Sequence, residues 1–194
     1  MNKDKLMQAI EQVEGRESKM YMLKNTPHIG IGHNIVSRTL ADETLDFLGI
    51  EDESDLMTVE LNDEQIEYLL ERDLDIAIND AKSVIGQEIF DLLDDERQDV
   101  LFDMSFNLGR PRFSKFSKMI VAVQDGDFDE AANQILDSKA ARDPLTAGRY
   151  ADLAERMRVG SAKIASARVE QVDTGLDGAT SQELIAEISR RLGL

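Results

Sequence analysis

One short segment holds both histidines of the chain and a glutamate suited to acid chemistry. Glu14 ends a stretch typical of an amphipathic helix, and Gly15 follows it as a helix stop. His28 and His33 lie further on, among strand-favouring residues. A carboxylic acid can protonate a leaving group, whereas a neutral imidazole can activate water or attack as a nucleophile. These residue types therefore predict an acid–base cleft where the end of a helix faces a small sheet.

The elements that must position these residues follow from the periodicity of apolar residues. Leu6, Ile10 and Val13 recur at helical spacing and predict a short first helix. Residues 18–36 are rich in strand formers punctuated by Gly, Pro and Asn, which predicts a small β-hairpin or meander. We expect residues 37–60 to form a polar connection with one or two short helical turns.

A long amphipathic helix is predicted to start at Asn62, because Gln65 three residues later completes a capping box. Its apolar positions recur at helical spacing as far as Ile85. Further helices are predicted at residues 94–108, 113–124, 127–138, about 144–158 and, after a linker rich in small residues, from Thr180.

The predicted fold class is α+β, predominantly α, with a small N-terminal antiparallel sheet and a helical bundle joined by a long helix. The predicted division of the chain is an N-terminal lobe at 1–61, a linking helix at 62–86, a C-terminal bundle lobe at 87–160 and a tail at 161–194.

Composition excludes several classes of protein. The 194 residues include no Cys, so disulfide scaffolds, thiolate chemistry and cysteine metal sites are excluded, and we expect neither a metal nor an organic cofactor. The net charge of −17 argues against a nucleic-acid partner, because neutralising phosphates requires an excess of Lys and Arg. No apolar run approaches the length of a membrane span, so stable membrane insertion is not expected, and no signal peptide is visible.

The acidity is concentrated in one part of the sequence. Residues 51–99 contain 18 acidic and 3 basic residues, a net charge of −15. Residues 104–124 contain no acid but hold Arg110, Arg112, Lys115 and Lys118. This cationic stretch is predicted either to contact an anionic cell-wall polymer or to form ordinary ion pairs with the acidic helix.

Two sets of motifs resemble a known family. The first set comprises Glu14-Gly15, Tyr21 and Ile29-Gly30-Ile31-Gly32-His33, which match the family's pattern in order and nearly in spacing. The second comprises Phe106-Asn107-Leu108-Gly109 followed by Phe113. These motifs resemble the phage-type (T-even phage) lysozymes, a family of peptidoglycan glycoside hydrolases. The resemblance covers about residues 5–160 and implies a two-lobed lysozyme-like fold with the cleft between its lobes.

The resemblance implies a role for each matching residue. Glu14 would be the proton donor, and Arg149 would orient it, with Tyr21 and Asn107 as supporting residues. Gly30 and Gly32 would provide tight backbone geometry. From the residues themselves, His33 is expected to be structural, because it follows a Gly that allows close packing and Asp73 on the long helix can be its partner.

Two members of the family's catalytic set are changed in this sequence. The family has an Asp in the hairpin, but here no acid occurs between Glu17 and Asp42. The family's Thr before the Ile-Gly-Ile-Gly-His run is replaced by His28. His28 could activate water, or it could attack the sugar and give retention of configuration. Alternatively, Glu14 could act alone, as in lytic transglycosylases that form anhydro-muramic products.

The function implied is bacteriolytic, antimicrobial cleavage of the β-1,4 bond between N-acetylmuramic acid and N-acetylglucosamine in glycan strands. The setting implied is phage lysis, with the enzyme held in the host cytoplasm until a holin releases it, or phage entry, with the enzyme in the virion. A decayed lysozyme scaffold that binds the wall or builds the virion is the non-enzymatic alternative. The tail helix is predicted to dock on the bundle, bind a partner or self-associate.

Overall fold

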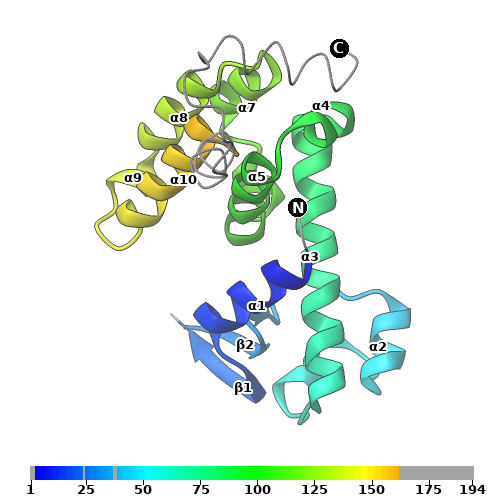
Figure 1. Cartoon of the computed structure of the whole chain (residues 1–194). Helices are drawn as coiled ribbons and strands as arrows, with labels where there is room; N and C mark the ends of the chain where they lie inside the picture. Colours follow the sequence, from blue (N-terminus) through cyan, green and yellow to red (C-terminus); the bar gives the residue numbers. More distant parts are fainter. Residues whose placement is uncertain (1–2, 24, 37–38, 162–194) are drawn as a thin grey trace, which may run out of the picture. The chain divides into compact units, whose positions relative to one another are not determined.

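The computed structural model describes residues 3–23, 25–36 and 39–161. The chain divides into two compact units, residues 1–160 and 161–194. The first unit is mostly helical with one small sheet, which confirms the predicted α+β, lysozyme-like class (Figure 1). The predicted helix from Thr180 lies outside the described residues, and the predicted lobe boundaries at residues 61 and 86 stay predictions.

The N-terminal part consists of a helix followed by a three-stranded antiparallel sheet. Helix α1 spans Lys3–Glu14 and ends where Gly15, at φ +76°, donates its N–H to the Glu11 carbonyl at 2.9 Å. The strands follow in the order β1-β2-β3, namely β1 Glu17–Leu23, β2 Thr26–Gly30 and β3 His33–Asn34. The predicted meander is therefore present.

Two short helical elements connect the sheet to the long helix. Helix α2 spans Asp42–Leu48, and a 3-10 helix spans Glu53–Met57. Helix α3 spans Asp63–Ile85, and the Asn62 and Gln65 side chains each accept a hydrogen bond from the other's backbone N–H. The predicted capping box is confirmed, because both orphan N–H groups at this helix start are satisfied.

The remaining helices are mostly those predicted, with three differences. Short helices α4 (Gln87–Leu92) and α9 (Lys139–Arg142) were not expected, because four to six residues give too little periodicity. The helix predicted at 113–124 begins only at Ser117, since Phe116 before it adopts a non-helical ψ of 43°, and a separate short helix ends at Phe113. The C-terminal set is α5 Asp95–Leu108, α6 Arg110–Phe113, α7 Ser117–Gln124, α8 Phe128–Leu136 and α10 Ala147–Val159.

Helix α3 contributes to two separate hydrophobic cores. Its first half, from Ile66 to Ala77, packs with Ile29, Ile31 and the connection residues in an N-terminal core. Its last turns, with Ala81 and Ile85, pack with the C-terminal helices in a second core. One amphipathic helix therefore joins two cores, and residues on either side of it can face a common site.

None of the helices in the described part of the chain is both long and apolar enough to cross a membrane.

Candidate active site

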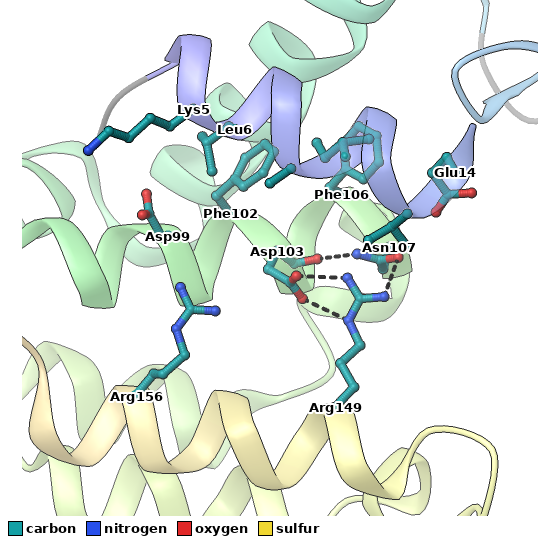
Figure 2. Close-up of a pocket in the computed structure, with 13 residues that line it drawn as sticks. Lys5, Leu6, Glu14, Asp99, Phe102, Asp103, Phe106, Asn107, Arg149 and Arg156 are labelled. Carbon is teal, nitrogen blue, oxygen red and sulfur yellow. Dashed lines mark hydrogen bonds and ion pairs between the residues drawn. The ribbon is translucent and has the colours of Figure 1, made fainter. Parts of the chain in front are cut away.

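A cavity of about 510 Å³ lies beside α1 and is closed on its other sides by residues of α5 and α10. Figure 2 shows that Glu14 and Asn107 lie at one end of it, and Lys5 and Asp99 at the other. The middle is apolar and is lined by Leu6, Ala9, Ile10, Val13, Phe102 and Phe106. Such an apolar wall with a few charged groups at its ends is typical of a ligand site.

Glu14 stands where this cavity meets the sheet. It is the last residue of α1 and is partly buried. Gly32, at φ +73°, brings the chain after β2 so close that a Cβ there would lie 3.2 Å from the Glu14 Cγ. Within the described part of the chain, the Glu14 carboxylate forms no hydrogen bond or ion pair. Its bonding capacity is therefore available for a ligand.

Tyr21 lies close to Glu14 on the side of the sheet. Burial raises the pKa of the Tyr21 phenol, and the negative charge of Glu14 raises it further, while the nearby Gly32 backbone acts in the opposite direction. The hydroxyl oxygen is buried and has no hydrogen-bond partner of normal geometry among the described residues. The phenol is therefore a neutral donor held near the carboxylate.

His28 lies opposite Tyr21 in the β1–β2 register, with the two ring centroids 5.8 Å apart. The residue is only 9% exposed. The Nδ1 atom lies 3.0 Å from the Thr26 carbonyl, so Nδ1–H donates there and a neutral ring keeps its lone pair on Nε2. His28 is not among the residues that line the cavity, and it reaches the Glu14 side of the sheet through its contact with Tyr21.

His33 fills the structural position expected of it. Its Nδ1 donates to Oδ2 of Asp73 at 2.9 Å, and both side chains are 1% exposed. His33 also pairs with Ile29 across β2 and β3. This hydrogen bond links the sheet to the middle of α3, and it confirms the predicted pairing of His33 with Asp73.

Arg149 does not make the expected contact with Glu14 in the described residues. Its guanidinium donates to both carboxylate oxygens of Asp103, at 3.1 and 2.7 Å, and to Oδ1 of Asn107 at 2.9 Å (Figure 2). The pair of Arg149 with Asp103 is bidentate, which is a strong and geometrically specific interaction. Arg149 and Glu14 nevertheless line the same cavity.

Two carboxyl groups on the cavity were not anticipated. Asp103 binds Arg149, and Asp99 lies one turn earlier on α5. Burial raises the pKa of Asp99, against the opposing charge of Arg156. Asp99, Asp103 and Asn107 recur every four residues, so a helical plot of α5 would have placed them on one face.

No group of three or more His, Asp or Glu side chains in the described part of the chain is arranged to hold a metal ion.

Comparison with known proteins agrees with this fold and site. The sequence profile of the phage lysozyme family matches residues 11–172, which is most of the chain, so the chain belongs to that family. A protein of Dictyostelium discoideum, called probable T4-type lysozyme 2, is 30% identical over 136 residues, covering 64% of this chain and 78% of the relative. The family is one of glycoside hydrolases whose substrate is peptidoglycan, and the chain is a lysozyme-like hydrolase of this kind.

Proposed function

We propose that this protein cleaves the β-1,4 bond between N-acetylmuramic acid and N-acetylglucosamine, with Glu14 as the proton donor. The observation that carries the proposal is the position of Glu14, whose carboxylate has no partner among the described residues where the cavity meets the sheet. In contrast, the guanidinium groups on the cavity, Arg149 and Arg156, are already paired with Asp103 and Glu96. Glu14 is therefore the group most free to act on a bound sugar.

Glycoside cleavage needs a second group besides the acid, and we assign this role to His28. Protonation of the leaving oxygen by Glu14 breaks the bond to the anomeric carbon, while a base removes a proton from the attacking water. The Nε2 lone pair of His28 is suited to that step, because its Nδ1–H is held by the Thr26 carbonyl. If the same nitrogen attacked the anomeric carbon instead, a covalent intermediate would form and the configuration would be retained.

The lack of a hairpin carboxylate supports one further candidate, a lytic transglycosylase that uses Glu14 alone. The described residues between Glu17 and Asp42 include no acid. In this reaction Glu14 first gives its proton to the leaving oxygen. It then takes the proton of the muramic 6-hydroxyl as that oxygen closes the anhydro ring. No water is consumed, so the products differ from those of hydrolysis.

The proton-donor role is tested by clearing of permeabilised bacterial cells, followed as turbidity. Glu14→Gln should lower the rate by about a thousandfold or more, because the amide cannot deliver the proton. Glu17→Gln is the matched control, since Glu17 is an exposed neighbour that also acts electrostatically on Tyr21. Equal rates for wild type and Glu14→Gln, or no clearing by wild type, would support a decayed wall-binding or virion structural protein instead.

The role of His28 is tested by combining His28→Ala with mass spectrometry of digested peptidoglycan. If His28 is a base or nucleophile, the digest should contain reducing muramic ends, and His28→Ala should lower the rate by about 100-fold or more. Anhydro-muramic ends, made equally well by His28→Ala, would favour the transglycosylase route.

The biological setting we propose is a bacteriophage one, in lysis or in entry. The family match supports it only in general terms. For the lysis role, bacteria that express the protein should stay intact until a holin-type pore opens their membrane, and should then lyse. Lysis without any pore would contradict holin-dependent release, and detection of the protein in purified virions would favour entry.

A further inference from the structure

Helix α1, which ends at Glu14, is held to the rest of the protein by little apolar packing. It has no buried residue, whereas every other helix of seven or more residues in the described part of the chain has some. Its residues Leu6, Met7 and Ile10 pack against the N-terminal core while only partly buried, and the cavity lies beside it. Apolar contacts alone therefore do little to fix the position of this helix.

Ion pairs attach both ends of α1 to α3. Four acids of α3 recur at every fourth position and so lie along one face of that helix, namely Asp63, Glu67, Glu71 and Asp75. Lys3, the first residue of α1, contacts the last two of these acids at 2.9 and 2.8 Å. Arg16, two residues beyond Glu14, contacts the first two at 3.2 and 3.3 Å. The acidic face of α3 therefore meets a cation at each end of the helix that carries Glu14.

The cationic stretch at residues 110–118 takes little part in pairing with this acidic helix. Arg110 lies 3.9 Å from Asp80 on α3 and donates to Ser83 at 2.9 Å. No ion pair with the described residues is formed by the other three cations, Arg112, Lys115 and Lys118. Pairing with the acidic helix, one of the two expectations for this stretch, is therefore met by Arg110 alone.

Arg16 makes more contacts than Lys3 and lies closer to Glu14. Its Nε donates to Oε1 of Glu11, in the last turn of α1, at 2.6 Å, while its two Nη atoms donate to Asp63 and Glu67. The hydrogen bond from Arg16 lowers the pKa of Glu11, so this carboxylate stays ionised. One planar guanidinium therefore bridges the last turn of α1 and the first two turns of α3, which a single ammonium group cannot do.

The same contacts fix the turn that follows Glu14. Gly15, the residue between Glu14 and Arg16, has no atom within 4 Å of the position that a Cβ would take, so side-chain packing does not hold this turn. The three acids that bind Arg16 hold it instead. They also occupy a cation that lies only two residues from the Glu14 carboxylate, which forms no ion pair among the described residues.

We infer that Arg16 is a positioning residue for Glu14, because it holds the catalytic end of α1 against α3. This inference rests on the proposed function. Arg16 does not line the cavity, so it acts through the helix and not on the substrate. Helix α3 is a firm support, since it packs in both hydrophobic cores. Loss of Arg16 should therefore leave substrate binding intact and slow the chemical step, because the distance from the acid to the leaving oxygen changes.

The test compares Arg16→Gln with Arg158→Gln as a matched control. Arg158 also joins two helices through an ion pair, with Asp129 at 3.1 Å, and it does not line the cavity. The Arg16 and Arg158 side chains are 26% and 34% exposed. With soluble peptidoglycan fragments as substrate, Arg16→Gln should lower kcat about tenfold and leave KM within about twofold, whereas Arg158→Gln should change neither. Arg16→Lys should restore kcat to within about threefold of wild type, because an ammonium keeps only part of the bridge.

The route through α3 is tested from its acidic side. The double variant Asp63→Asn/Glu67→Gln should lower kcat about as much as Arg16→Gln does, because it removes the same bridge. Combining all three substitutions should cause no further loss. Losses that multiply in the combined variant would show that Arg16 does not act through these acids, and would overturn the inference.

A measurement without turnover separates this inference from the proposed cleavage. Hydrogen exchange of the α1 amides, followed by mass spectrometry, should be about tenfold faster in Arg16→Gln than in wild type and unchanged in Arg158→Gln. Equal exchange of α1 in the two arginine variants would overturn the inference even if the protein proved inactive. So would an unchanged kcat in Arg16→Gln, or a rise in KM as large as the fall in kcat. Thermal unfolding of each variant checks that the fold is intact.

Discussion

The two walls of the candidate site differ in how their polar groups are used. On the C-terminal wall, Asp103, Asn107 and Arg149 bond to one another and form a closed network. On the N-terminal wall, the Glu14 carboxylate and the buried Tyr21 hydroxyl have no hydrogen-bond partner among the described residues. The first wall therefore holds its own shape, whereas the second keeps bonding capacity for a substrate. Acid catalysis requires this combination: polar groups that can still bond to a substrate, held beside a wall whose own polar groups are already hydrogen-bonded.

The largest effect is expected at the buried pair beneath the N-terminal wall. Asp73→Ala should lower the free energy of unfolding by about 3 kcal/mol, because it removes the buried acceptor of the His33 ring. Urea unfolding of Asp73→Ala, His33→Ala and the double variant measures the coupling. If the two single effects simply add, the pair does not support this wall.

The next prediction separates the effect of the Glu14 side-chain position from the effect of backbone strain at Gly32, on the same wall. Gly32→Ala should reduce activity by about 100-fold, because the new Cβ displaces the Glu14 side chain. Gly126→Ala is the matched control, since Gly126 has the same φ of +73° with no atom within 4 Å of an added Cβ. Both variants should lose about 1 kcal/mol of stability, and only Gly32→Ala should lose activity. Equal activity in the two would mean that Glu14 does not need its present position.

The C-terminal wall should respond more weakly. Asp103→Asn should reduce activity by about tenfold or less and stability by less than about 1 kcal/mol, because its pair with Arg149 is partly exposed. Asp129→Asn, which breaks an exposed pair with Arg158 away from the cavity, should leave activity unchanged. An activity loss for Asp103→Asn as large as that for Glu14→Gln would show that this wall takes part in the chemistry.

The smallest effect is expected at Asp99, at the far end of the cavity. Its pKa is raised in the fold by burial, so the stability linked to its protonated form is present below pH 3.8 and is lost as pH rises through the raised pKa. Asp99→Asn should therefore be more stable than wild type at neutral pH, by about 1 kcal/mol or less.

The gain from Asp99→Asn should shrink below pH 3.8, and thermal unfolding at the two pH values measures it. Asp46→Asn removes a carboxylate from an exposed position and should show no such pH-dependent gain. Loss of activity in Asp99→Asn would extend the reactive region to the far end of the cavity.

The local elements were predictable because their signals are local. The capping box at Asn62 and the stop at Gly15 depend on side chains within a few residues of each other. The partner of His33 was also predicted, since an acid on the buried face of a predicted helix has few other roles. In contrast, Val13 was expected on the apolar face of α1 but is 78% exposed, and it lines the cavity. Periodicity places a residue on a face without showing what covers that face.

The sequence by itself determined the fold class, the family resemblance and the choice of Glu14, because the motif from Glu14 to His33 is continuous in the chain. Only the tertiary structure decided that Arg149 binds Asp103 and Asn107, and that Arg112, Lys115 and Lys118 remain unpaired. Those outcomes depend on contacts between residues up to 46 positions apart. Competition among several acids for one cation is resolved by distance and geometry, which no local pattern encodes.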